Sequence, residues 1–201
     1  PCNLVCGCVG GIPVVWLARI PSAIHCRNRH VLGAINCALL SDTKGFQVAG
    51  PIIREETIGN CRLLLGDSLE IMHGLTFDAM CCDPPYGIGD KMVGSGHFAG
   101  LCKKMGGDAG WDKSPPPQHV FINDFPTIAW GGNYLGLPPS RGWLAWVKSN
   151  AAPTFASVEL AWTNMDFNAK HFLGPCGAPA AEKAGHPTQK PVALMEWCLG
   201  F

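Results

Sequence analysis

The sequence is poor in charge, in long apolar runs and in repeated segments. Only 15% of its 201 residues are charged and the formal net charge is zero, which excludes a strongly basic nucleic-acid coat. Local basic patches stay open at Lys103 and Lys104 and at Arg141 with Lys148. No apolar run approaches the length of a membrane span, and no internal repeat is present. The N-terminal stretch has neither a clear basic start nor a small-residue cleavage site, which argues against a signal peptide.

Cysteine, in contrast to charged residues, is abundant, with 11 in the chain. The spacing is irregular, and Cys81 and Cys82 are adjacent in an apolar run, where neighbouring side chains point to opposite faces of a strand. We therefore expect most cysteines to be reduced, small, buried residues of a cytoplasmic protein. No metal site is predicted, because the paired Cys-x-x-Cys spacing of a zinc site is missing from the N-terminal set of Cys2, Cys6, Cys8 and Cys26.

The chain divides near residue 50. Residues 1–50 have a periodicity that fits neither helix nor strand, and we interpret them as an irregular, Cys-rich leader of unknown role. Residues 51–201 alternate apolar runs with turn signals, which is typical of an α/β domain with a mostly parallel sheet. A long loop is expected at 87–118, where a function is common. The expected strands are 62–65, 77–82, 127–130, 142–147, 157–163 and 168–172, and the expected helices are 68–73, 118–125 and 191–199.

Two acids follow the first two expected strands. Asp67 comes after strand 62–65 and Asp83 at the end of strand 77–82, and the two strands with the short helix between them are predicted to form a parallel βαβ unit. Ligands of parallel α/β sheets bind beyond the carboxyl ends of the strands. Both acids are therefore candidate site residues, although Asp67 equally suits the N-cap of the helix that follows it.

The stretch Asp83-Pro84-Pro85-Tyr86 combines rigidity, acceptors and an aromatic ring. Each proline fixes φ and removes an N–H donor, so the Asp83 carboxylate and the Pro84 carbonyl can face one small ligand without competing donors. Two acceptors suit the two hydrogens of one NH2 group, and stacking a base on Tyr86 is worth roughly 1–3 kcal/mol. The pattern favours a flipped adenine or cytosine. A plain turn, with Asp83 as a turn residue, is the alternative.

Four stretches in a fixed order carry a resemblance to a known family. Residues 77–87 resemble the signature of the DNA N6-adenine and N4-cytosine methyltransferases. The stretch His186-Pro187-Thr188-Gln189-Lys190-Pro191 looks like the matching motif of their permuted, beta-class members. Between the two, Trp130-Gly131-Gly132-Asn133-Tyr134 and Glu159-Leu160-Ala161-Trp162-Thr163 resemble segments of phage- and prophage-type members. The likeness covers roughly residues 58–201.

The resemblance implies S-adenosylmethionine as cofactor, double-stranded DNA as partner and a doubly wound, Rossmann-like methyltransferase sheet. It implies that Asp83 and the Pro84 carbonyl hold the target amine, with adenine N6 favoured over cytosine N4. Pro85 belongs to the same rigid catalytic stretch, and Tyr86 is implied to stack on the flipped base. The residues implied to lie at the cofactor are Asp67, Asp83, His186, Thr188 and Lys190, with Lys190 reaching its carboxylate as a point charge.

The glycine-rich cofactor loop of the family, a Phe-x-Gly-x-Gly segment, does not follow the last expected helix, and no such turn occurs elsewhere. The sequence therefore predicts an incomplete doubly wound sheet, with residues 51–201 as the N-terminal portion of a methyltransferase catalytic domain. Two alternatives stay open. One is a non-catalytic nucleic-acid-binding fragment of such an enzyme, and the other is a methyltransferase that acts on RNA or on a protein amide.

Overall fold

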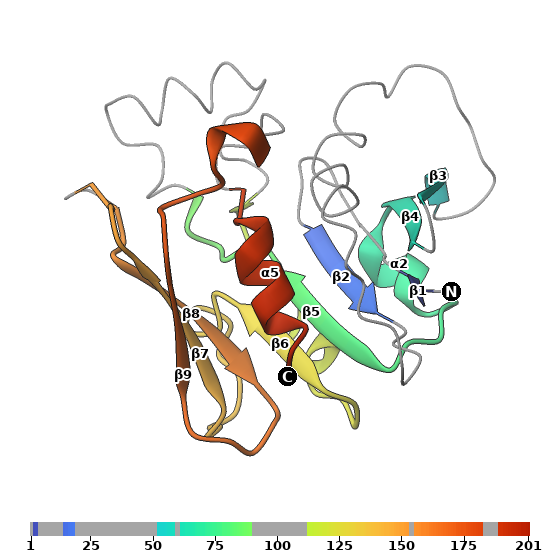
Figure 1. Ribbon diagram of the computed structural model, residues 1–201. Helices are drawn as coiled ribbons and strands as arrows, with labels where there is room; N and C mark the ends of the chain where they lie inside the picture. Colours follow the sequence, from blue (N-terminus) through green and yellow to red (C-terminus); the bar gives the residue numbers. More distant parts are fainter. Residues whose placement is uncertain are drawn as a thin grey trace.

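A mixed six-stranded sheet forms the centre of the protein (Figure 1). The computed structural model describes residues 2–3, 14–18, 52–58, 61–89, 112–152, 155–182 and 189–201, and only the backbone for 2–3, 14–18, 58 and 61. The strand order is β2-β5-β6-β8-β7-β9. The strands are β2 (Val14–Ala18), β5 (Ala79–Asp83), β6 (Thr127–Trp130), β7 (Trp143–Lys148), β8 (Val158–Thr163) and β9 (Lys170–Gly174).

The strands of this sheet pair in both senses. β5 runs parallel to β6, and β7 runs parallel to β9. The pairs β2–β5, β6–β8 and β7–β8 are antiparallel. β7 and β8 follow each other closely in the chain, and a short connection permits only an antiparallel pair. The mixed α/β content is therefore confirmed, but the sheet is mixed rather than mostly parallel, because only two of its five strand pairs are parallel.

A smaller sheet has the order β1-β4-β3. Its strands are β1 (Cys2–Asn3), β4 (Cys61–Gly66) and β3 (Ile52–Ile58), and β3 and β4 form an antiparallel hairpin. The predicted βαβ unit is therefore wrong, because β4 and β5 lie in different sheets. β4 finds its hydrogen-bond partner in the strand immediately before it, which the apolar pattern of the sequence did not reveal.

The helices of the described residues are short. α2 (Ser68–Met72) follows β4, and α5 (Val192–Cys198) begins after Pro191 as the sequence predicts. The helix expected over 118–125 is only one 3-10 turn, η2 (Gln118–Val120), and a second such turn is η3 (Ala180–Glu182). The chain does not continue as a helix after η2, because the Asn123 side-chain amide donates to the Val120 carbonyl at 3.1 Å and competes with a helical hydrogen bond there.

Two apolar clusters cover the two faces of the central sheet. α5 lies across one face (Figure 1) and buries Val192, Leu194, Met195 and Cys198 there. The other face is covered by α2 and by the segment around Phe121. Cys81 belongs to the first cluster and Cys82 to the second, which confirms that these adjacent side chains point to opposite faces. Cys81, Cys82 and Cys198 are all buried free thiols.

Strands β1 and β2 belong to residues 1–50, which the sequence predicts to be an irregular leader. β2 pairs with β5 from Val14↔Asp83 to Ala18↔Ala79, and β1 pairs with β4. This part of residues 1–50 therefore borders both sheets, while the side chains of its cysteines lie outside the described part of the structure. Among the residues that the structure does describe, none of the helices is long and apolar enough to cross a membrane.

Candidate functional site

Several strand ends meet at one edge of the six-stranded sheet. β5 and β6 are parallel neighbours, so the end of β5 at Asp83 lies beside the end of β6 at Trp130. β8 is antiparallel to both β6 and β7. Its second residue, Glu159, therefore reaches the same edge, and so does Lys148 at the end of β7. The topology thus gathers two acids and a lysine from three strands.

The Asp83 carboxylate is held by Tyr86, from the first motif of the resemblance, and by Lys190, from the second. The Tyr86 hydroxyl donates to Asp83 Oδ1 at 2.6 Å. The Lys190 ammonium lies 2.6 Å from Asp83 Oδ2 and donates to the Tyr86 oxygen at 3.3 Å. Tyr86 and Lys190 are 104 residues apart in the chain, so the fold brings the two motifs into one hydrogen-bonded cluster.

Glu159 continues the cluster toward β7. Its Oε2 lies 3.4 Å from Lys190 Nζ, and its Oε1 accepts from Lys148 Nζ at 2.5 Å. The order Lys148, Glu159, Lys190, Asp83 alternates in charge, and the side chains of both lysines are under a tenth exposed. Buried ions of one sign are costly, so each charge here is compensated by its neighbours.

The pKa directions follow from burial and from these neighbours. Burial lowers the pKa of Lys190, but the charges of Asp83 and Glu159 raise it by more, so the net shift is upward. Burial raises the pKa of Glu159, but Lys190 and Lys148 lower it by more, so the net shift is downward. Burial first, and then the negative charges of Asp83 and Glu159, raise the pKa of Tyr86 well above its usual value. Tyr86 is therefore a neutral phenol and a hydrogen-bond donor.

The Tyr86 ring packs tightly against the turn that follows β6. It stacks on Tyr134, with ring centroids 5.5 Å apart and planes 19° apart. It also lies so close to Gly131 that a Cβ there would sit 2.1 Å from a ring carbon. Gly131 has φ +71, a conformation that glycine adopts without penalty. Two glycine-specific features, close approach and positive φ, thus coincide beneath the Tyr86 ring.

A second acid, Asp112, holds the backbone behind Tyr86. Its side chain is 1% exposed, and its carboxylate accepts hydrogen bonds from three consecutive N–H groups. These are the N–H groups of Tyr86, of Gly87 at 2.8 Å and of Ile88 at 3.2 Å. Asp112 is not among the predicted site residues, because it lies in a loop whose sequence carries no periodic signal.

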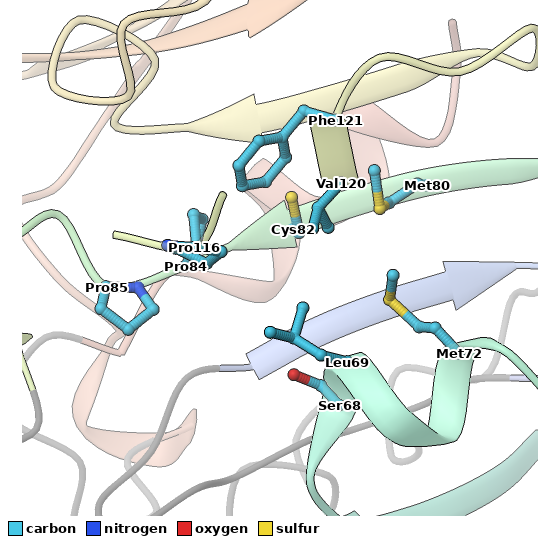
Figure 2. Close-up of a pocket in the computed structure, with 10 residues that line it drawn as sticks. All are labelled: Ser68, Leu69, Met72, Met80, Cys82, Pro84, Pro85, Pro116, Val120 and Phe121. Atoms are coloured by element: carbon cyan, nitrogen blue, oxygen red, sulfur yellow. The ribbon is translucent and has the colours of Figure 1, made fainter. Parts of the chain in front are cut away.

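Pro84 and Pro85 lie beside α2 as well as beside Tyr86. Figure 2 shows them lining a small apolar cavity with Leu69 and Met72 of α2 and with Phe121. The cavity measures about 20 Å³. That is room for about one water molecule, so neither a base nor a cofactor ring fits in it.

The residues expected at the cofactor differ in where the structure places them. Asp67 caps α2, accepting from the N–H groups of Leu69 at 2.9 Å and Glu70 at 3.5 Å, so the N-cap interpretation accounts for its position. Lys190 joins Asp83 and Tyr86. His186 and Thr188 lie outside the described residues.

The segment next to Lys190 is well anchored. The Gln189 side chain is 4% exposed and donates to the Glu182 carbonyl at 2.7 Å. The Glu182 carboxylate accepts from the N–H of Val192 at 3.0 Å, where α5 begins. These bonds fix the backbone on both sides of Lys190, so its ammonium enters the cluster from a rigid support.

The other charged and aromatic candidates have structural explanations. Arg141 binds Asp166 at 2.9 Å and Asn168 at 2.7 Å, and Lys148 is neutralised by Glu159, so these two cations do not form an open basic patch. The tryptophans expected to pack do so: Trp146 and Trp162 are buried, while Trp143 and Trp197 are half-buried against the two clusters. Lys103 and Lys104 lie outside the described residues.

The residues that complete the site beyond the predicted ones are Glu159, Lys148, Gly131, Tyr134 and Asp112. Glu159 carried two signals: it is a lone acid near the start of an otherwise apolar strand, and it begins one of the four stretches that carry the resemblance. No protein-family model, no curated protein and no solved structure matches the chain in comparisons with known proteins.

Proposed function

We propose that the chain carries the amine-binding part of a DNA methyltransferase that modifies the exocyclic amine of a flipped base, adenine N6 before cytosine N4. One observation carries the proposal: Asp83 and Tyr86 from the first motif and Lys190 from the second form one hydrogen-bonded cluster. The cluster supports the proposal because it unites the two stretches that carry the resemblance. The Rossmann-like character of the sheet and the SAM dependence of the reaction belong to the same proposal.

Asp83 is suited to hold an amine. Each carboxylate oxygen has two lone pairs, so Asp83 can accept from the amine while it keeps Tyr86 and Lys190 as partners. Drawing the amine hydrogens toward Asp83 localises the nitrogen lone pair, which otherwise spreads into the base ring. When that nitrogen gains a methyl group it becomes acidic, and the released proton leaves through Asp83 to water.

Tyr86 and Tyr134 form the aromatic part of the proposed site. Tyr134 is 47% exposed, and its ring lies against Tyr86. A base that stacks on Tyr86 takes the place of the Tyr134 ring, which is the exposed member of the pair. Stacking of this kind tolerates either base, and the acceptors at Asp83 and Pro84 suit the amine of either, so the preference for adenine rests on the family resemblance of the motif that begins with Asp83.

The surroundings of Lys190 bear on the binding of S-adenosylmethionine. S-adenosylmethionine, when bound, would supply the methyl group, and the bond broken is the one to its sulfonium sulfur, which is left as a neutral thioether. Of the residues expected to hold it, Lys190 fits an anionic group, because its contact with Glu159 Oε2 at 3.4 Å is the longest it makes with an acid. A ligand carboxylate that replaces that contact leaves Lys190 with two negative partners, while Glu159 keeps Lys148 as its partner.

The alternative is a chain that binds nucleic acid without transferring a methyl group. The test uses the protein expressed from the full reading frame that contains these residues, with tritiated S-adenosylmethionine and unmethylated DNA. We expect label in adenine, and a loss of at least about a hundredfold in kcat for Asp83→Ala with DNA affinity largely kept.

Asp78→Ala is the matched control, because Asp78 is an exposed acid just before the same strand. It should transfer methyl groups at the wild-type rate. Full activity of Asp83→Ala overturns the proposed role of Asp83. DNA binding without any label in the wild-type protein supports the non-catalytic alternative, and label in RNA or protein alone shifts the substrate class.

A further inference from the structure

We infer that Asp112 is a positioning residue of the proposed amine site, which fixes the direction of the Tyr86 ring through the backbone of residues 86–88. The inference rests on the proposed function for its kinetic consequence. Its structural basis does not, because it depends only on hydrogen bonds and burial.

The stretch from Asp83 to Ile88 is short of backbone donors. Pro84 and Pro85 have no N–H, so this stretch cannot be secured there by backbone donor bonds. The first N–H groups after Asp83 belong to Tyr86, Gly87 and Ile88, and all three donate to one carboxylate, that of Asp112. Asp112 thus accepts from every N–H in the five residues after Asp83.

The three N–H groups converge because of the local backbone conformation. Gly87 has φ +73, and a left-handed residue between two ordinary ones turns successive N–H groups toward a common point. Such a concave arrangement binds an anion, and here the anion is a side chain of the same protein. A Cβ at residue 87 would also meet Pro115 at 2.9 Å, so the turn is packed as well as bonded.

The direction of Tyr86 follows from this anchor. The ring must reach Asp83 with its hydroxyl, stack on Tyr134 and clear Gly131 by a narrow margin. If the backbone at 86–88 is released, the hydroxyl and the ring move together. A displacement of about 1 Å at a reacting centre costs about a hundredfold in rate, even when substrates still bind.

The test compares Asp112→Asn with Asp124→Asn in the full-length protein. Asp124 is an exposed acid in the same part of the chain and serves as the matched control. We expect Asp112→Asn to lose about a hundredfold in kcat, with KM for DNA and for S-adenosylmethionine changed by less than about threefold. The pattern arises because positioning affects the reacting geometry rather than initial binding.

Hydrogen exchange gives a readout that does not depend on methyl transfer. In the wild-type protein the amides of Tyr86, Gly87 and Ile88 should exchange slowly although they lie outside the strands. In Asp112→Asn these amides should exchange faster while those of β5 and β6 stay protected.

Each outcome decides one question. Unchanged kcat in Asp112→Asn, or fast exchange at 86–88 in the wild-type protein, overturns the positioning role. A kcat loss matched by loss of protection throughout the sheet also overturns it, since the effect is then general unfolding. If the wild-type protein transfers no methyl group, the proposed function fails, and the exchange data alone still judge Asp112. If Asp112→Asn does not fold, the wild-type exchange rates decide.

Discussion

Replacing Gly131 by alanine tests the packing that supports the Tyr86 ring. The added Cβ would lie 2.1 Å from a ring carbon, whereas non-bonded carbons prefer about 3.5–4.0 Å. The ring must therefore retreat by about 1.4 Å or more. That movement stretches the 2.6 Å hydrogen bond from Tyr86 to Asp83 beyond the usual range for O–H···O bonds.

The expected cost has two parts. A residue other than glycine at φ +71 costs about 1–2 kcal/mol, and overpacking a filled site costs about 1–3 kcal/mol more. Gly131→Ala should therefore lower the free energy of unfolding by about 2–5 kcal/mol. Gly177→Ala is the matched control, because Gly177 has φ +84 with no atom near its added Cβ. It should cost only the backbone part, about 1–2 kcal/mol.

A double-mutant cycle measured by urea unfolding isolates the clash. In a Tyr86→Ala background the added methyl has room, so Gly131→Ala should cost only the backbone part. The coupling energy between the two positions should be about 1–3 kcal/mol. If Gly131→Ala costs the same in both backgrounds, the ring does not rest on Gly131 and the reasoning about this contact is refuted.

Three further predictions follow from burial and charge. The protein has two tyrosines, so in Tyr134→Phe the absorbance at 295 nm reports Tyr86 alone. Because burial and the charges of Asp83 and Glu159 raise the pKa of Tyr86, this absorbance should rise only well above pH 10; a normal titration would contradict the burial of Tyr86 beside these two acids. The folded pKa of Glu159 lies below its ordinary value of 4.5, so its contribution to stability is present above pH 4.5 and is lost as the pH falls through the folded value. Acid unfolding followed by circular dichroism should therefore be less pH-dependent in Glu159→Gln. An identical pH profile would contradict the pairing of Glu159 with the two lysines. Leu194→Ala should lower the free energy of unfolding, measured with urea, by about 2–5 kcal/mol, because this α5 side chain is fully buried. Leu199 is exposed, so Leu199→Ala should change the free energy of unfolding by no more than about 0.5 kcal/mol. Equal effects would contradict the packing of α5 on the sheet.

Local patterns in the sequence predicted the strands well. The runs that became β5, β6, β7 and β8 are apolar and bounded by turn residues, and such runs depend little on what they pair with. The start of α5 was predictable from Pro191 and the apolar spacing after it.

The pairing of strands was less accessible. Whether the strand 62–65 joins β5 or β3 depends on hydrogen bonds between segments, and the sequence pattern is the same in both cases. The pattern also hid β3, where polar and charged residues such as Arg54, Glu55 and Glu56 occupy a strand of the small sheet. Strand existence is a local property, while strand partnership is not.

The candidate site divides in the same way. Asp83 and Tyr86 were identified because a double proline after a strand is locally unusual. Asp112 could not be identified, because its function lies in three backbone groups that are 24 to 26 residues away in the chain. Glu159 and Lys148 became partners only when the β7–β8 hairpin brought them to one edge.

The ion pair between Asp83 and Lys190 has a consequence for how the protein is made. The chain is synthesised from its N-terminus, and Tyr86 leaves the ribosome 104 residues before Lys190. At about 5–20 residues per second, the growing chain holds the acid for about 5–20 s before its cation arrives. During this interval α5 is also missing, so one face of the sheet is uncovered. The proposed site and the hydrophobic cover of the sheet are thus completed by the same segment, residues 189–201, and a nascent chain that has not reached that segment has neither.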